Sequence, residues 1–178
     1  MNRVRTSQSI SRSGLTVETG LNASTVSNIV NDLLAEELVR EAELLQSEIG
    51  RPSRLLESNP KGGCALGVEL NVDYLLAILT DFTANVLWKK RVSIGPVDRQ
   101  EEILAQLEIL IQEGINTEEA SGLKLHGIGI GVPGLVDYHT GVLRIAPNLS
   151  WRNVPILDIL SNRFQCRCNC DGSHCFGV

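Results

Sequence analysis

Residues 127–151 read GIGIGVPGLVDYHTGVLRIAPNLSW, and this stretch carries the most information about the fold. Its apolar start, interrupted by glycines, predicts a strand at Leu125 to Val132 where another backbone or a ligand comes close. Pro133-Gly134 breaks that strand, a hairpin-like segment follows, and Pro147-Asn148-Leu149 then forms a stiff corner. The Asn148 amide both donates and accepts hydrogen bonds, which suits a site that recognises hydroxyl groups.

The residues before this stretch predict three strands and one helix. Cys64 to Leu70 is typical of a buried strand, and further strands are expected at Tyr74 to Thr80 and Val86 to Val92. Between Arg99 and Gly114 apolar residues return at helical spacing and predict an amphipathic helix. Its buried stripe contains Ile103, Leu107, Leu110 and Ile111.

The bulk composition limits the classes of function. The chain has 178 residues, of which 43% are hydrophobic, enough for one domain or two small ones with a packed core. Its net charge of −5 means that any nucleic-acid contact must come from a local basic patch. Aromatic residues make up 4%, which argues against a stacking platform for single-stranded nucleic acid. With neither a membrane-spanning apolar run nor a signal peptide, we expect a cytoplasmic protein that has no contact with membranes.

Residues 1–59 are predicted to form a separate module, because Asn59-Pro60-Lys61-Gly62-Gly63 breaks regular structure and suits a linker. Ser11 is expected to cap a helix that ends near Thr19, followed by a turn at Gly20 and a core residue at Leu21. Asn22 or Ser24 then caps a second helix. The residues of this second helix expected to face inward are Val26, Ile29, Val30, Leu33 and Leu34.

The opposite face of the second helix carries short polar side chains that can approach base edges and phosphates. They are Ser24, Thr25, Ser27, Asn28 and Asn31. By itself this face also fits an ordinary amphipathic helix in contact with solvent. The residues that follow favour DNA binding, because strands at Leu38 to Arg40 and Arg54 to Glu57 flank a basic tip. Two helices and such a hairpin make a winged helix-turn-helix, in which Arg12, Arg51 and Arg54 are the expected phosphate contacts.

The chain resembles the ROK family of repressors, open reading frames and kinases. The matching strings are ISRSGLTVETGLNASTVSNIVNDLLAEELVRE and GRPSRLLESNP, and the resemblance runs from about Ile10 to Phe164. It implies an α/β chain with a winged helix-turn-helix in residues 1–59 and a truncated actin-like, ribonuclease-H-like lobe in residues 60–178. Only Met1 to Gln8 stand before the predicted helices, so the helix that normally comes first in such a DNA-binding module is expected to be largely missing.

The resemblance also implies a function. The expected protein is a fragment of a sugar-responsive transcriptional regulator of carbohydrate genes, and a repressor is expected rather than an activator. Its partners would be a double-stranded DNA operator and a small sugar or sugar-phosphate effector, and an intact relative would form a homo-oligomer. In the family the two proline motifs line the sugar pocket, so Asn148 would bind a sugar hydroxyl and the Gly134 backbone would lie against the ring. The alternative is that Asn148 caps a turn and Trp151 fills the core.

Kinase activity is not expected. ROK sugar kinases carry a phosphate-binding Asp-x-Gly-Gly-Thr segment after the first strand, but residues 67–73 read GVELNVD. The family's general base lies in a Glu-Asn-Asp-Ala-Asn pattern, and we do not transfer that role to Asp171. A kinase fragment, a non-functional remnant and a protein-binding module remain the alternatives.

The tail after Phe164 is rich in cysteine, and we interpret it as truncated or out-of-frame sequence. Zinc sites usually space each ligand pair by two to four residues, and the tail does not. We therefore expect neither a metal site nor a cofactor there. The residues concerned are Cys166, Cys168, Cys170, His174 and Cys175.

Overall fold

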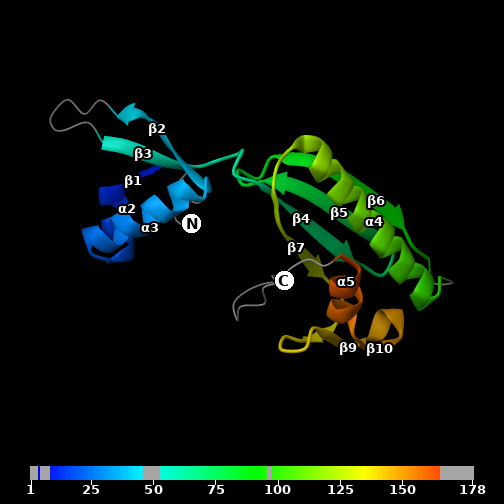
Figure 1. Ribbon diagram of the computed structural model, residues 1–178. Coiled ribbons are helices and arrows are strands. Elements are labelled where there is room, and N and C mark those ends of the chain that lie inside the picture. The colour runs from blue at the N-terminus through cyan, green and yellow to red at the C-terminus, as the bar shows by residue number, and fades with distance from the viewer. Residues whose placement is uncertain (1–3, 5–8, 46–52, 96–97, 165–178) are drawn as a thin grey trace. The chain divides into compact units, whose positions relative to one another are not determined.

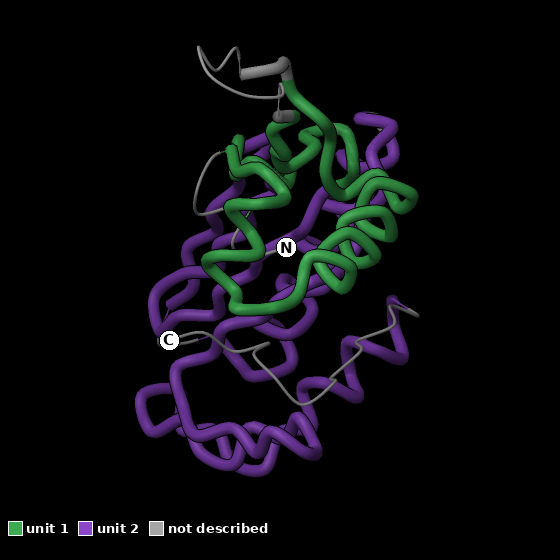
Figure 2. Tube along the Cα trace, turned by 90° about the vertical axis from the view of Figure 1, so that its left-hand side faces the viewer, with its two compact units in different colours: residues 1–63, 81–85 green, residues 64–80, 86–178 purple. Residues whose placement is uncertain are grey.

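The computed structural model describes residue 4 and residues 9–45, 53–95 and 98–164 (Figure 1). Arg51, most of the predicted basic tip and the cysteine-rich tail lie outside these ranges. The chain divides into two compact units (Figure 2), residues 1–63 with 81–85 and residues 64–80 with 86–178. Within the described residues no helix is both long and apolar enough to cross a membrane.

The first unit contains two helices and a small antiparallel sheet. Its elements are β1 (Ile10–Ser11), α2 (Arg12–Thr19), α3 (Ala23–Ala35), β2 (Val39–Leu45) and β3 (Ser53–Ser58), and the strand order is β1-β3-β2. Ser11 caps α2 by accepting the Gly14 N–H at 3.0 Å, as predicted. Asn22, the first of the two expected candidates, caps α3 by accepting the Thr25 N–H at 2.8 Å.

A compact apolar core holds this unit together. Its buried members are Val4, Ile10, Leu15, Val26, Val30, Val39 and Leu56, with Leu33 and Leu34 packed at the edge. Two predictions were wrong, because Ile29 and Leu21 are each 43% exposed. Val26 and Val30 face the core of the unit, and Ile29 is turned about 100° away from Val30. Leu21 lies in the short exposed turn between the helices.

The predicted linker, Asn59 to Gly63, is hydrogen-bonded to the turn between α3 and β2. The Asn59 side-chain amide donates to the Glu37 carbonyl at 2.7 Å, and the Gly62 N–H donates to the Asn59 carbonyl at 3.0 Å. Glu37 has a positive φ of 57°, and a side chain on Gly62 would overlap its carbonyl oxygen. This glycine is therefore required for close packing as well as for a break in regular structure.

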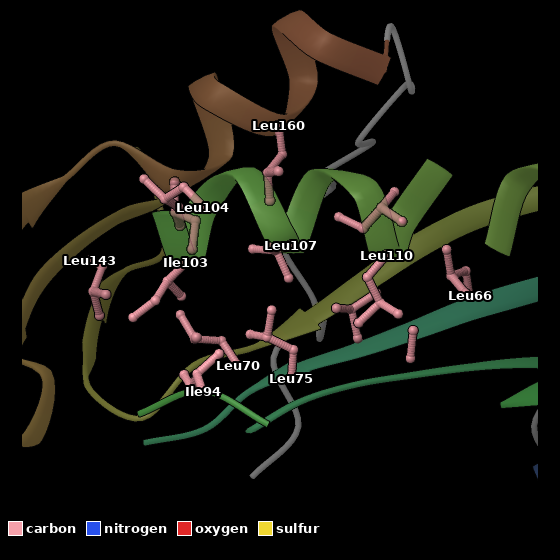
Figure 3. Close-up of a cluster of buried hydrophobic side chains, with 14 of the residues drawn as sticks. Leu66, Leu70, Leu75, Ile94, Ile103, Leu104, Leu107, Leu110, Leu143 and Leu160 are labelled. Atoms are coloured by element: carbon pink, nitrogen blue, oxygen red, sulfur yellow. The ribbon is translucent and has the colours of Figure 1, made fainter. Parts of the chain in front are cut away.

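The second unit is built on a four-stranded sheet of order β6-β5-β4-β7. The strands are β4 (Cys64–Leu70), β5 (Tyr74–Asp81), β6 (Val86–Ser93) and β7 (Leu125–Gly131), with α4 (Gln100–Ser121) between the last two. Strand β7 runs parallel to β4, while β6 is antiparallel to β5. Burial alternates along β4 and β5, so every second residue faces α4. Figure 3 shows these side chains meeting the buried stripe of α4, including Leu107 and Leu110.

The helix α4 extends to Ser121, past the predicted end at Gly114. Gly114 is an interior residue whose missing side chain lets the helix approach the sheet. A Cβ there would lie 2.8 Å from a Leu66 methyl carbon and 3.3 Å from the Trp88 ring. The helix ends instead at Gly122, which adopts a left-handed φ of 70°.

A second, three-stranded sheet follows β7. It consists of β8 (Leu135–Asp137), β9 (Val142–Ala146) and β10 (Trp151–Val154), in the order β10-β9-β8. A single turn of 3-10 helix, η1 (Pro147–Leu149), joins β9 to β10, and α5 (Ile156–Phe164) completes the described chain. Trp151 is 4% exposed and belongs to the same core as α4, so it fills the core.

Candidate functional site

The polar face of α3 lies on the surface of the first unit. Ser24, Asn28 and Asn31 are exposed, and Thr25 and Ser27 are half-buried. The Ser24 hydroxyl donates to the Asn22 side-chain oxygen at 2.7 Å, next to the cap that begins the helix. The five residues therefore form one face of a capped helix, with hydroxyl groups at its N-terminal end and amides farther along.

Two of the predicted phosphate-contacting arginines converge on Glu41 of β2. Arg12, at the start of α2, donates to the Asn31 side-chain oxygen at 3.0 Å and lies 3.5 Å from one Glu41 carboxylate oxygen. Arg54, on β3, pairs with the other oxygen of the same carboxylate. The charge-assisted hydrogen bond from Arg54 lowers the pKa of Glu41 below its usual value, and the same bond raises the pKa of Arg54.

Sequence reasoning missed Glu41, although the hairpin register contains the signal. Glu41 pairs with Leu56, so Arg54 is its diagonal neighbour on the adjacent strand. The register shifts between Glu41 and Leu44, and this irregularity in strand pairing cannot be predicted from the sequence. The network therefore joins α2, α3, β2 and β3 through two guanidinium groups, one carboxylate and one amide.

The structure brings together the two motifs predicted for the sugar site. A Cβ on Gly134 would lie 3.1 Å from the Cα of Ala146 and 2.8 Å from a Leu143 methyl carbon, and it would overlap the Ile145 carbonyl oxygen. Because Ala146 directly precedes η1, the Pro133-Gly134 turn lies beside the Pro147 to Leu149 corner. The missing side chain of Gly134 is thus already explained by its packing on β9.

Asn148 occupies the middle of η1 and is exposed. The cap of η1 is Ala146, and no side chain caps this helix. The Asn148 amide also makes no hydrogen bond to another residue in the described ranges, so turn capping does not explain it. On the hairpin of β8 and β9, Asp137 accepts from Arg144 at 2.7 Å and from the His139 N–H at 3.0 Å, which lowers the pKa of Asp137 to about 2. Asp137 and His139 thus belong to the hairpin-like segment that the sequence predicts between Gly134 and Pro147.

The turn between β4 and β5 is filled by its own polar groups. The Asn71 amide and the Tyr74 hydroxyl each donate to one Glu69 carboxylate oxygen at 3.0 Å. The Val72 N–H donates to the Asn71 side-chain oxygen at 2.7 Å, and the Asn71 N–H donates to the Tyr74 carbonyl at 2.8 Å. The Arg91 guanidinium carbon lies 4.0 Å from the Tyr74 ring centroid. A phosphate placed here would meet a carboxylate and two backbone N–H groups that are already bonded.

Relatives of the chain are mostly named as regulators. The chain is 34% identical to the xylose repressor of Caldicellulosiruptor bescii and 34% identical to that of Bacillus subtilis, each over 88% of this chain. The alignment with the latter covers 158 residues, more than the second unit contains, so it includes much of the first unit. The chain spans about two fifths of the length of these curated relatives.

A solved structure supports the same relationship. The crystal structure of a ROK family transcriptional regulator, a homolog of the Escherichia coli MLC protein, superposes with a TM-score of 0.67 and 28% identity, over 88% of this chain and 39% of that one. The ROK family pattern matches residues 65–172. This match continues past Phe164 into the cysteine-rich tail, although the abrupt change of composition predicts that it stops there. The chain belongs to the ROK family.

Proposed function

We propose that this chain is part of a sugar-responsive transcriptional repressor of carbohydrate genes. The first unit would bind operator DNA as a winged helix-turn-helix, and the second unit would bind the sugar. The observation that carries the proposal is the first unit itself, in which a capped helix bears an exposed polar face that Arg12 and Glu41 link to Arg54. The naming of the relatives as xylose repressors and the alignment of both units support it.

In the proposed complex α3 lies in the major groove of the operator. Its hydroxyl and amide side chains read base edges, for which Asn is well suited because it can bond adenine through two atoms. The residues proposed for this role are Ser24, Thr25, Ser27, Asn28 and Asn31. Arg12 and Arg54, which meet at Glu41, contact phosphates beside the helix, and Arg51 does so from the tip of the hairpin.

The proposed sugar site is the corner where Gly134 meets η1. The exposed Asn148 amide supplies one donor and one acceptor, as a sugar hydroxyl requires. Xylose is the first sugar to test, since the relatives are named for it. Sugar binding would shift the population of the longer protein toward a state with lower operator affinity, and a homo-oligomer would read a two-fold symmetric operator.

The direct test is a binding selection with the 178-residue chain on a random-sequence duplex library, followed by anisotropy titrations with the selected duplex. The expected result is enrichment of a defined sequence that is bound at least about tenfold more tightly than a scrambled duplex. Xylose binding by Asn148→Ala should be weaker than by wild type, while Asn162→Ala, an exposed asparagine on α5, is the matched control. Absence of any sequence enrichment would contradict the DNA-binding role.

The kinase alternative is disfavoured by the turn between β4 and β5. Phosphoryl transfer relies on backbone N–H groups and cations around the phosphates, and this turn offers a carboxylate instead. Incubation with ATP and xylose should therefore leave the sugar unmodified, as followed by mass spectrometry. A phosphorylated sugar would restore the kinase interpretation.

A further inference from the structure

The network of Arg12, Asn31, Glu41 and Arg54 contains a negative charge. Such a charge is unexpected on a surface that is proposed to bind DNA. A carboxylate lies between Arg12 and Arg54, and it would be repelled by the same phosphates that attract the arginines. If charge alone mattered, removing this carboxylate should strengthen binding to every duplex, whatever its sequence. The presence of Glu41 at this point therefore needs a reason other than overall affinity.

Stability is not a sufficient reason. The Glu41 side chain is 26% exposed, while those of Arg12 and Arg54 are 35% and 67% exposed. Ion pairs in contact with solvent contribute little to folding, and the core of this unit is apolar and separate from the network. The first unit should thus fold with almost unchanged stability when the carboxylate becomes an amide.

Geometry supplies the reason. A guanidinium group has five N–H donors, and each arginine uses only some of them within the network. The carboxylate fixes two long and flexible side chains, one from α2 and one from β3, and Arg12 also bonds Asn31 on the polar face of α3. Restricting these rotamers before binding reduces the entropy that would be lost on contact with phosphates.

We infer that Glu41 is a positioning residue that sets the DNA specificity of the first unit. It holds Arg12 and Arg54 in one arrangement relative to Asn31, so that their remaining donors meet phosphates when α3 is in its reading register. This inference rests on the proposed function. It predicts that replacing Glu41 weakens binding to the selected duplex and strengthens binding to a scrambled one. A change of charge alone, or of stability alone, would affect both duplexes in the same direction.

The test compares Glu41→Gln with Glu57→Gln. Glu57 pairs with Arg40 on the same hairpin at 3.3 Å and its side chain is 31% exposed, so its replacement removes an equal charge without touching the network. Binding is measured by anisotropy with the duplex selected by the wild-type chain and with a scrambled duplex. Glu41→Gln should bind the scrambled duplex about twofold more tightly and the selected duplex about fivefold more weakly.

Glu57→Gln should shift both duplexes in the same direction and by the same factor. Glu41→Asp keeps the charge but is too short to bridge both arginines, so it should weaken binding to the selected duplex and leave the scrambled one unchanged. The inference is overturned if Glu41→Gln tightens both duplexes equally, or if Glu41→Asp behaves as wild type. A wild-type chain that prefers no sequence would instead refute the proposed function, and circular dichroism melts identify any variant that fails to fold.

Discussion

Replacing Arg12 and Arg54 together by alanine tests whether these side chains contact phosphates. Each phosphate that a cation neutralises contributes about 0.9 to the slope of log affinity against log salt concentration, so two contacts contribute about 1.8. Between 50 mM and 200 mM salt, the double variant should therefore lose roughly tenfold less affinity than the wild type loses. Its absolute affinity at 50 mM should be lower, since two attractive contacts are missing.

A loss of folding would not account for such a result. Both arginines are at the surface, and the pairs that they form with Glu41 contribute about 0–1 kcal/mol to folding, so the variant should remain folded. The matched control is Arg40→Ala with Lys61→Ala, which removes two exposed positive charges of the same unit outside the network. Anisotropy titrations at four salt concentrations give the slopes. A wild-type slope for the Arg12 and Arg54 variant would remove both residues from the DNA interface.

Three further predictions concern the second unit. Gly134→Ala should lower the free energy of unfolding by about 2 kcal/mol or more, measured by urea denaturation, because the new Cβ overlaps the Ile145 carbonyl; Gly127→Ala, where nothing lies within 4 Å, should be much milder. Burial raises the pKa of the Cys64 thiol to about 11, so iodoacetamide at pH 8 should leave Cys64 unmodified in peptide mapping of the native chain and label it in urea. Since the folded pKa is raised, the contribution of this thiol to stability is complete below about pH 9 and is lost as the pH rises through 11, and Cys64→Ala should remove that loss.

Local patterns were sufficient to predict much of the fold. The cap at Ser11, the strand from Cys64 to Leu70 and the apolar stripe of α4 all follow from neighbouring residues, and the structure contains each of them. The failures occurred where a residue type has two physical uses. Gly114 is typical of a helix end, but it permits close packing on Leu66. Ile29 has the spacing of a core residue, but it lies at the edge of the helix face that Val26 and Val30 bury in the core.

In the candidate sites, too, some features follow from the local sequence and others depend on tertiary pairing. The two motifs of the proposed sugar site are recognisable because each is a short string with a proline, whereas their proximity depends on the pairing of Leu135 with Ile145. Glu41 had no local signal at all. Its partners come from two other elements, α2 and β3, and the carboxylate reaches Arg54 only because β2 and β3 pair in a particular register. A charge network of this kind, which links separate elements, can be recognised only in the tertiary structure.

In the proposed function, two places in the second unit separate sugar binding from catalytic turnover. At the corner formed by Gly134 and η1, the Asn148 amide is exposed, and it can exchange hydrogen bonds with a hydroxyl group. At the end of β4, Glu69 and Tyr74 close the turn, and the Glu69 charge opposes a phosphate. A sensor must release its sugar unchanged, since a modified sugar would no longer report the free concentration. In the proposed function, the closed turn therefore protects the signal, because it removes phosphate binding while leaving the hydroxyl-binding corner intact.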